Sequence, residues 1–331
     1  MISYEQEDNW SLANLLKEQP DAVEEFRDHF PDLRYEAYPA GPSGPLRLRA
    51  ALADADVAIV HEWNEPEIIH LLGHLARELG IRAVFHDTHY RVVLDDGYRA
   101  RLGLENYHDM LAFSPSVAER YHALGFRNVH VVHEAADTTV FKPLERPMQH
   151  DVVFIGNYGD GDRNDELERF VFGPRMQLPH LRYAMYGVRY PDAVLVRMRN
   201  GLAVEFGGGV RNVQVPEVYA ASKVALHVPR RQYVELLPGT PTIRMFEALA
   251  TGTCLVSLPW PDTDALFTAG TGGDYLVVRT SAEMRDALEW LTADDAARER
   301  IGRQGLSTIL ARHTCDHRAD QLLALLGSGS R

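Results

Sequence analysis

Three polar side chains stand at the start of one predicted helix and are of the types that bind a nucleotide. Thr242 is a typical N-cap residue, Arg244 falls in the first turn, and Glu247 lies one turn further on. The unpaired N–H groups and positive dipole end of a helix N-terminus suit a phosphate, and an arginine adds a permanent charge. A carboxylate such as that of Glu247 can accept hydrogen bonds from two ribose hydroxyls. We therefore expect a diphosphate and a ribose, and hence a nucleotide, at this helix.

The stretch around these residues has the pattern of a loop, a short helix and a buried strand. Apolar side chains recur at helical spacing from residue 243 to residue 250, beginning with Ile243. Gly252 follows as a residue suited to the end of a helix, and the apolar run 254–257 predicts a strand. Ile243, at the start of this helix, is placed with Thr242 among the residues expected to contact the nucleotide.

Two strands in the second half of the chain are predicted to end at glycines. The run 151–155 leads into Gly156, and the run 181–186 leads into Gly187. A glycine at the end of a strand in an open α/β sheet lets the backbone come close to a ligand at the carboxyl edge. Both glycines are therefore expected to border the nucleotide.

The polar loop after Gly156 holds two further candidates, Asn157 and Arg163. Their place after a strand predicts that they face the same crevice as Arg244 and Glu247. The alternative interpretation is a polar turn that only caps the helix behind it. A third arginine, Arg230, follows the apolar run 223–228 and is expected to pair with a phosphate, as is its neighbour Arg231. For these two the alternative is a solvated surface position.

The same loop alternates oxygen-bearing side chains in the manner of a calcium loop, at Asp160, Asp162 and Asn164. In the EF-hand pattern, however, the sixth position is Gly and the twelfth is Glu. Asp165 and Val171 stand at those places. We therefore expect no calcium there, and no bound metal is predicted for the chain.

A second group of polar residues follows a short apolar run in the first half of the chain. His86 and Asp87 come directly after the predicted strand and are expected at its carboxyl edge. One alternative is a metal site formed by His86 and His89 with Asp95 or Asp96, for which two histidines three apart on a loop are a weak signal. Another is a pair of loop histidines that bond only to the backbone.

The run from Arg244 to Gly252, Arg-Met-Phe-Glu-Ala-Leu-Ala-Thr-Gly, resembles the signature loop and helix of glycosyltransferases with the two-domain GT-B fold. Its Arg-x-Phe-Glu-Ala part resembles the CgeB-like (spore maturation protein) branch. In the wider retaining family a first glutamate precedes the second with seven residues between them, and Gly239 occupies that place here. The resemblance implies that Glu247 binds the ribose and that the contact of the first carboxylate with the donor sugar is missing.

The resemblance extends to other parts of the chain. His86 and Asp87 resemble the His-Asp with which retaining GT-B enzymes meet the donor sugar, so the implied catalytic residues are His86, Asp87 and Arg244. The segment 213–223 resembles the CgeB-like turn that holds the nucleobase; for Val215 and Pro216 the alternative is a strand end and a helix start. The expected donor-nucleotide residues are Gly156, Asn157, Arg163, Gly187, Val215, Pro216, Tyr219, Arg230, Thr242, Ile243 and Glu247.

Strand and helix patterns alternate along the whole chain, which predicts the α/β class with parallel sheets. With the resemblance, we expect a GT-B fold in which two Rossmann-like parallel-sheet domains face a central cleft. The expected organisation is a short acceptor-side domain 1–143, a linker 144–150, a nucleotide-sugar domain 151–310, a closing helix 311–326 that packs back on the first domain, and a disordered tail 327–331. Residues 1–3 hardly provide the strand and Gly-rich loop with which the family begins, so an upstream start or a trimmed domain is an alternative.

Composition and charge narrow the function classes. The chain has 331 residues, 45% of them hydrophobic and 24% charged, with a net charge of −13. Because a polyanion needs a basic face, nucleic acids are not expected as partners. Cys254 and Cys315 are expected to be reduced packing residues. The N-terminus lacks the features of a signal peptide and no apolar run reaches the length of a membrane span, so we expect no integral membrane segment and a cytoplasmic location.

Together these patterns predict an enzyme, a metal-independent glycosyltransferase that moves a sugar from a nucleotide-diphosphate sugar to an acceptor. No other cofactor is expected, and the acceptor is a small molecule or a glycan. One alternative is a GT-B nucleotide-sugar epimerase, which needs no acceptor. Another is a catalytically inactive nucleotide-sugar binding module, an alternative that Gly239 leaves open. The base, the sugar, the acceptor, the stereochemical outcome and the oligomeric state do not follow from the sequence.

Overall fold

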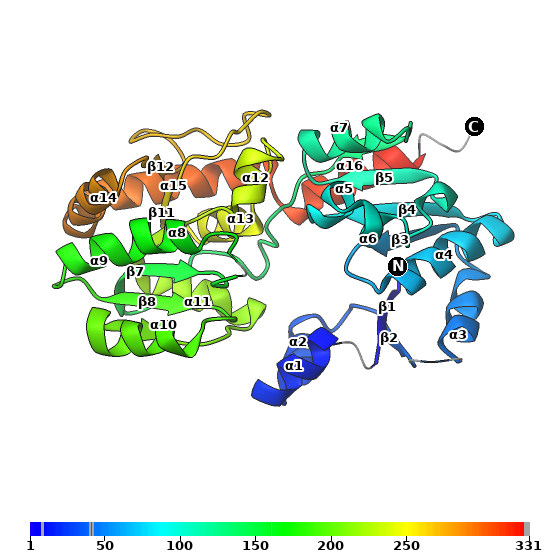
Figure 1. The fold of residues 1–331 in the computed structure, drawn as a ribbon, viewed down its shortest axis with the longest axis horizontal. Coiled ribbons are helices and arrows are strands. Elements are labelled where there is room, and N and C mark those ends of the chain that lie inside the picture. The colour runs from blue at the N-terminus through cyan, green and yellow to red at the C-terminus, as the bar shows by residue number, and fades with distance from the viewer. Residues whose placement is uncertain (8–9, 40, 42, 160, 328–331) are drawn as a thin grey trace. The chain divides into compact units, whose positions relative to one another are not determined.

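The computed structural model of the chain describes residues 1–7, 10–39, 41, 43–159 and 161–327. It consists of two compact units (Figure 1). The first unit comprises Met1–Ala112 and Val117–Val131, and the second comprises Phe113–Ser116 and Val132–Arg331. Every ladder between the described strands is parallel, which confirms the predicted α/β class.

The first unit contains a two-stranded sheet and a four-stranded sheet. The smaller sheet pairs β1 (Ser3–Gln6) with β2 (Tyr35–Tyr38). The larger sheet has the sequential order β3-β4-β5-β6 and is formed by β3 (Val57–His61), β4 (Arg82–Asp87), β5 (Asp109–Ala112) and β6 (Val129–Val131). Residues 3–6 thus do form a strand, although residues 1–3 were expected to provide hardly any of one.

The helices of the first unit begin and end largely where Pro and Gly predict. They are α1 (Trp10–Glu18), α2 (Ala22–His29), α3 (Ser43–Leu52), α4 (Pro66–Leu79), α5 (Arg91–Leu94), α6 (Asp96–Arg99), the 3-10 turn η1 (Leu104–Asn106) and α7 (Pro115–Ala123). In α4, Pro66 occupies the first turn, and Gly80 ends the helix with a φ of 72°. Ile69 of α4 and Phe85 of β4 are fully buried in the core of this unit.

The second unit is built on one six-stranded sheet with the order β12-β11-β10-β7-β8-β9. Its strands are β7 (His150–Ile155), β8 (Tyr183–Tyr186), β9 (Val204–Phe206), β10 (Ser222–His227), β11 (Cys254–Ser257) and β12 (Leu276–Val277). The chain starts at β7, moves outward to β9, and returns to β10 on the other side of β7. This is the Rossmann arrangement, in which ligands bind at the carboxyl ends of the strands where the order reverses.

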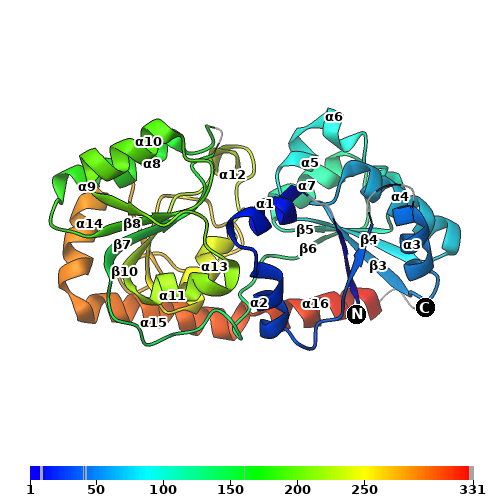
Figure 2. The same ribbon diagram turned by 90° about the horizontal axis from the view of Figure 1, so that it is seen from below.

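Helices cover both faces of this sheet (Figure 2). The helical segments α8 (Asn164–Leu167), η2 (Glu168–Phe172), α9 (Gly173–Gln177), α10 (Asp192–Arg197) and η3 (Met198–Leu202) lie on one face with α14 (Ser281–Ala293). The other face carries α11 (Val215–Ala220) and α13 (Ile243–Ala250). The remaining elements are η4 (Asn212–Gln214), α12 (Arg231–Glu235), α15 (Asp295–Arg312) and α16 (Cys315–Gly327).

The central strand β7 shows why the sheet is buried on both faces. Val152 and Phe154 belong to the apolar cluster under α14, whereas Val153 and Ile155 belong to the cluster under α13. Side chains alternate between the two faces of a strand, so a continuous apolar run packs against helices on both sides. Cys254 of β11 lies in the first of these clusters, as predicted.

Four details differ from the expectations or lie outside the described residues. The strand β4 runs on to Asp87, so His86 and Asp87 are its last two residues and not the start of a loop. Cys315 is exposed and does not pack in a core. Residues 132–143, which were predicted to end the first domain, are part of the second unit. There, Ala136 forms a bridge with Thr314, just before α16. Asp160 and residues 328–331 lie outside the residues that the structure describes.

Candidate functional site

The N-terminus of α13 is held by a side-chain bond that the sequence did not predict. Thr242 has the extended backbone of an N-cap residue, with φ −105° and ψ 151°, but its hydroxyl makes no capping bond. The hydroxyl instead lies 2.9 Å from Nε2 of His227, at the end of β10. Thr242 is therefore the N-cap residue, as predicted, but its side chain does not bond to the helix backbone. Thr242 connects the helix to the central sheet, and its polar side chain is used in that contact.

His227 is a neutral imidazole in the middle of this network. Its Nδ1 lies 2.8 Å from the hydroxyl of Ser257, and that hydroxyl donates to the carbonyl of Leu258. Ser257 thus has only acceptor capacity left, which places the proton on Nδ1 and leaves Nε2 to accept from Thr242. Burial, aided by the charge of Arg163, lowers the pKa of His227 to about 3. His227 stands in an apolar run, where no sequence signal marked it.

Glu247 is buried with both carboxylate oxygens bonded. It is 2% exposed, its Oε1 accepts from the side chain of Asn212 at 3.1 Å, and its Oε2 accepts from Arg244. Burial raises the pKa of Glu247, and the Arg244 guanidinium opposes that rise. The Arg244 side chain is one third exposed. Asn212 was not among the predicted residues; it orients the carboxylate expected to bind the ribose.

A second carboxyl group faces this pair. The Oε2 atom of Glu134 is buried without a hydrogen-bond partner. Burial raises the pKa of Glu134 to about 8, the Glu247 charge adds to the rise, and Arg244 opposes it. Near neutral pH Glu134 is therefore largely protonated and carries one hydrogen-bond donor. Its sequence neighbourhood contains no spacing that would have singled it out.

The two strand-end glycines allow the ends of β7 and β8 to approach closely. Gly187 has a φ of +147°, and a Cβ there would lie 2.2 Å from the carbonyl oxygen of Gly156. A Cβ on Gly156 would lie 2.7 Å from the Phe154 ring and 3.1 Å from Arg163 Nη1. Any larger residue would push these groups apart. Both positions require glycine for reasons of packing at the sheet edge where a ligand was predicted.

Arg163 spans the point where the strand order reverses. Its Nη1 donates to the carbonyl of Val228 at 3.0 Å, and its Nε is buried without a partner. Burial, together with the nearby charge of Arg230, lowers the pKa of Arg163 to about 10. A buried guanidinium N–H without an acceptor is costly, and an anion would satisfy it. This supports the predicted phosphate role of Arg163.

The other polar residues predicted at this edge form hydrogen bonds and ion pairs with neighbouring residues of the protein. The amide oxygen of Asn157 accepts from the backbone N–H of Val188 at 3.1 Å. Arg230 pairs with Asp162 at 3.4 Å. Arg231 pairs with Glu166 at 3.2 Å and with Asp165. Asn157 thus connects the loops after β7 and β8, and Arg231 is engaged with carboxylates on α8.

Three residues predicted around the nucleobase are buried in the core. Val215 and Tyr219 are 0% and 3% exposed and pack in the cluster under α13, and Pro216 is buried at the start of α11. Their side chains are therefore not free to contact a base, and only their backbone is available. Ile243 is half-buried at the start of α13. The side chains of Val215, Pro216 and Tyr219 thus pack in the interior of the second unit.

In the first unit, Asp87 is a buried anchor. It is 0% exposed; Tyr121 donates to its Oδ2 at 2.6 Å and the backbone N–H of His89 donates to its Oδ1 at 3.0 Å. Burial raises the pKa of Asp87 to about 7, against these two hydrogen bonds. With both oxygens engaged, Asp87 fits a positioning role better than direct contact with a substrate.

His86 lies beside a second histidine that sequence reasoning missed. It is opposite His61 in the β3–β4 register, and the two rings meet edge to face at 5.1 Å between centroids. Burial lowers the pKa of His86 to about 4, and lowers that of His61 to about 4 with help from the His86 charge. Both rings are neutral near pH 7. His61 could have been found only by pairing the two strand ends.

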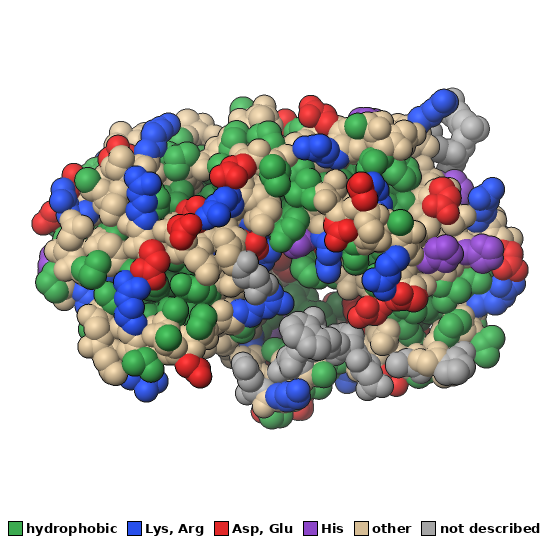
Figure 3. All heavy atoms as spheres, in the orientation of Figure 1, with side chains coloured by type: hydrophobic (Ala, Val, Ile, Leu, Met, Phe, Trp, Pro, Cys, Tyr) green, Lys and Arg blue, Asp and Glu red, His purple; other side chains and the backbone are tan. Residues whose placement is uncertain are grey.

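The described part of the chain contains neither a metal-ligand cluster nor a membrane-spanning helix. There, no group of three or more His, Cys, Asp or Glu side chains is placed to hold a metal ion. None of the helices in that part is long and apolar enough to cross a bilayer. On the face drawn in Figure 3, basic side chains are interspersed with acidic ones among the coloured residues.

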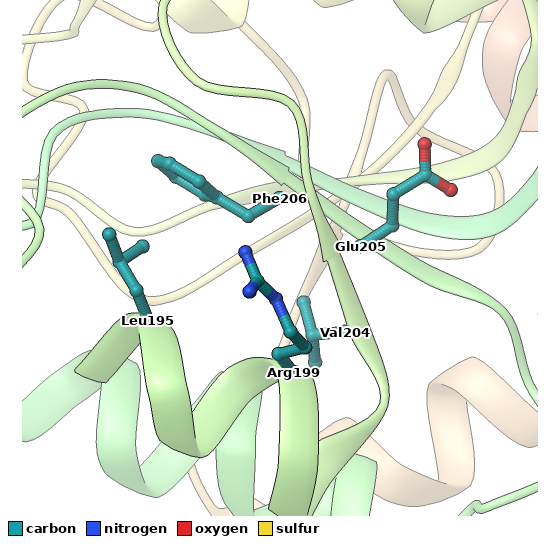
Figure 4. A pocket seen from close by; sticks show the side chains of 5 residues that line it. All are labelled: Leu195, Arg199, Val204, Glu205 and Phe206. Atoms are coloured by element: carbon teal, nitrogen blue, oxygen red, sulfur yellow. The ribbon is translucent and has the colours of Figure 1, made fainter. Parts of the chain in front are cut away.

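A cavity of about 260 Å³ lies elsewhere on the second unit, at the edge strand β9 (Figure 4). It is lined by Leu195 and Arg199 of the α10–η3 segment and by Val204, Glu205 and Phe206 of β9. None of the predicted donor residues lines it. The cavity is thus separate from the residues that the sequence selected.

Comparisons with known proteins agree with this architecture. A family model described as glycosyl transferase-like matches residues 163–324. A search of curated proteins finds no match. Anabaena HepE, crystallised in complex with UDP-glucose, has a TM-score of 0.73 and 13% identity, with 99% of each chain covered.

Two further solved structures are similar over most of the chain. Sucrose-phosphate synthase from Thermosynechococcus elongatus has a TM-score of 0.65 and 18% identity, and the match covers 90% of this chain and 84% of that one. The T4 phage protein BGT in complex with UDP and Mn²⁺ has a TM-score of 0.59 and 13% identity, covering 98% and 97%.

The chain therefore has the GT-B glycosyltransferase fold, and most of its second unit matches a glycosyltransferase family. The predicted fold is confirmed, and the match of residues 163–324 to a glycosyl transferase-like family model supports the predicted enzyme class. The CgeB-like branch, suggested by Arg244-x-Phe-Glu-Ala248, stays a prediction.

Proposed function

We propose that the protein transfers a sugar from a nucleotide-diphosphate sugar to an acceptor, with Arg163, Arg244 and Glu247 holding the donor. One observation carries the proposal. Arg163 has an unsatisfied buried N–H and is bonded to the carbonyl of Val228, just after β10, while the bond from Thr242 to His227 at the end of β10 holds the start of the helix that carries Arg244 and Glu247. At the carboxyl edge of a parallel sheet, two guanidinium groups can bind the diphosphate and a carboxylate can accept hydrogen bonds from the ribose hydroxyls. This set therefore matches the groups of a nucleoside diphosphate.

The two arginines would act mostly in the transition state. Negative charge grows on the diphosphate as the glycosidic bond breaks, and fixed donors aimed at that charge stabilise it without reorganising. Arg163 is held by Val228, and Arg244 is held by Glu247. In this proposal Glu134, as a protonated acid beside Arg244, limits the negative charge around the site to that of Glu247.

The donor to test first is a UDP-sugar. HepE, which shares the fold, was crystallised with UDP-glucose. At 13% identity this similarity concerns the fold, so the base and the sugar are part of the proposal. His86, on the first unit, is proposed to act on the sugar and not on the nucleotide, and Asp87 to hold the strand end that carries it. The cytoplasmic location and the CgeB-like branch likewise stay predictions.

The defining experiment incubates the purified protein with UDP-glucose and measures UDP release and the sugar product by NMR. Slow hydrolysis without acceptor, accelerated by an acceptor, supports a transferase. A changed sugar would indicate an epimerase, and saturable UDP binding without turnover would indicate an inactive binding module. Repeating the assay with GDP-, ADP- and dTDP-glucose assigns the base.

We also propose that turnover needs no divalent metal, because Arg163 and Arg244 can supply the charge that a metal would neutralise. The T4 phage protein, whose structure holds UDP and Mn²⁺, makes this worth a direct test. UDP release should be unchanged after exhaustive EDTA treatment. Loss of turnover that magnesium or manganese restores would contradict the proposal and return attention to the loop 157–165.

A further inference from the structure

An exposed tryptophan stands at the carboxyl edge of the first unit's sheet. Trp63 is 61% exposed and lies in the turn that follows β3. Its backbone N–H donates to Nδ1 of His61 at 3.2 Å, so the turn is fixed to the strand end. The ring of His89 meets the indole at 5.1 Å between centroids. The indole therefore presents a large apolar face to solvent from a held backbone, at an edge where α/β sheets bind ligands.

A guanidinium is fixed beside this indole. Arg91 lies 5.4 Å from the Trp63 ring centroid and 4.6 Å from that of Tyr98. Its Nη2 lies 3.4 Å from Glu62 Oε2, and its side chain is 36% exposed. Aromatic rings that pack against a guanidinium restrict its rotamers. The N–H groups at the edge of the guanidinium plane stay available for hydrogen bonds. Trp63 and Arg91 thus form a flat apolar surface with directed donors next to it.

Two buried polar atoms here have unmet hydrogen-bonding capacity. Glu62 is 0% exposed and its Oε1 has no partner, and the Nε of Arg91 is also buried without one. Buried polar groups are nearly always bonded, and exceptions are often functional. Glu62 cannot reach a ligand itself because its side chain is fully covered. Its evident contact is Arg91, so it acts as the residue that orients the guanidinium.

We propose that Trp63 and Arg91 form a carbohydrate subsite that binds the acceptor, with Glu62 as a positioning residue. A pyranose ring has an apolar C–H face that packs on an indole and equatorial hydroxyls that a guanidinium can bond, and this arrangement offers both side by side. The inference rests on the proposed transfer function and adds the substrate class, because it makes the acceptor a sugar or glycan. A nucleoside base, which also stacks on tryptophan, is the ligand that the test must separate from it.

The first test is saturation-transfer NMR of the purified protein with methyl α-D-glucopyranoside, methyl β-D-galactopyranoside, cellobiose and, as the base-stacking comparison, uridine. At least one sugar should receive saturation at its ring C–H protons. In Trp63→Ala its Kd should rise roughly tenfold or more, whereas Trp63→Phe should keep most of the affinity. Leu46→Ala, at a 71% exposed apolar position of the same unit, is the matched control and should behave as the parent.

The second test concerns Glu62. Glu62→Gln keeps an oxygen that accepts from Arg91 and should keep the sugar affinity, whereas Glu62→Leu should lose it to the same degree as Arg91→Ala. Circular dichroism checks that each variant is folded like the parent protein.

Sugar binding that Trp63→Ala leaves unchanged, uridine as the sole Trp63-dependent ligand, or no Trp63-dependent signal from any probe would overturn the subsite. Equal sugar affinity in Glu62→Leu and Glu62→Gln would overturn the positioning role. UDP release by the parent protein from UDP-glucose reports separately on the proposed function, so the two can fail independently.

Discussion

At the residue scale, Glu247 and Arg244, which are expected to bind the ribose and the diphosphate, already belong to a hydrogen-bonded set. Glu247 accepts from Asn212 and Arg244, so a ribose would take over part of an existing network in place of meeting a free carboxylate. A buried carboxylate held by two donors keeps a fixed orientation, which suits recognition of two adjacent hydroxyls. Asn212 should therefore matter through the geometry of Glu247.

We expect Glu247→Ala to weaken UDP binding. A lost charged acceptor costs on the order of 1.5–3 kcal/mol, and the Arg244 guanidinium is left without its partner. Isothermal titration calorimetry with UDP measures the change. Asn212→Ala should show a smaller loss, because Arg244 still orients the carboxylate. Parent-like affinity in Glu247→Ala would contradict the ribose role.

We expect His86→Ala to bind free UDP normally but to lose turnover by roughly a hundredfold or more, the scale of a lost positioning or acid–base group. The reason is that His86 is proposed to act on the sugar, where an effect appears in rate more than in nucleotide binding. Steady-state UDP release gives turnover, with His89→Ala and Asp87→Asn as comparisons. If His86→Ala turns over normally while a neighbour variant does not, the role belongs to that neighbour; if all three stay active, the strand end is structural.

At the scale of elements, one small network connects three parts of the second unit. Thr242 at the start of α13, His227 at the end of β10 and Ser257 at the end of β11 are bonded in series. The direction of each hydrogen bond follows from the single proton of each hydroxyl. The network sets where the N-terminus of α13 stands relative to the sheet edge, and so where Arg244 is carried.

We expect Thr242→Val to destabilise the protein by about 1–3 kcal/mol, because it leaves the buried Nε2 of His227 as an acceptor without a donor. Thr242→Ser keeps the hydroxyl and should lose much less. Urea denaturation followed by circular dichroism measures the difference. Equal stability of the Val and Ser variants would show that the hydroxyl contact with His227 contributes nothing to the fold.

At the scale of the whole molecule, the chain forms two units that each bury their own core and each hold carboxyl groups with raised pKa values. In the first unit, burial raises the pKa of Glu62 to about 8 with help from Asp87 and against Arg91, and that of Asp87 to about 7. In the second unit Glu134 behaves similarly. These groups bind protons more tightly in the folded than in the unfolded chain, so they make stability depend on pH.

We expect Glu62→Gln to flatten the pH dependence of stability between about pH 5 and 8. The Glu62 pKa rises from 4.5 in its ordinary state to about 8 in the fold. Its contribution is therefore complete below pH 4.5 and is lost as pH rises toward 8. The loss is at most about 1.4 kcal/mol per pH unit. Calorimetric unfolding at several pH values measures the slopes, and parallel curves for parent and variant would show that Glu62 is ionised in the fold.

Much of the fold follows from local patterns in the sequence. The order of strands and helices, the parallel sheets, the start of α4 at Pro66 and the boundaries of α13 depend on side-chain periodicity and on Pro and Gly, which act over a few residues. The candidate donor residues Arg163, Arg244 and Glu247 could be predicted for the same reason. A polar side chain just after a strand, or in the first turn of the next helix, lies at the carboxyl edge of the sheet.

Only the tertiary structure decided which of these side chains are available and what surrounds them. Burial of Val215 and Tyr219 depends on α11 packing beneath α13, and the bond from Thr242 to His227 depends on where β10 ends. His61 meets His86 because of the β3–β4 register, and Glu62 meets Arg91 across 29 residues. Periodicity carries no information about such contacts, because they are set by strand register and by the packing of elements that are distant in the chain.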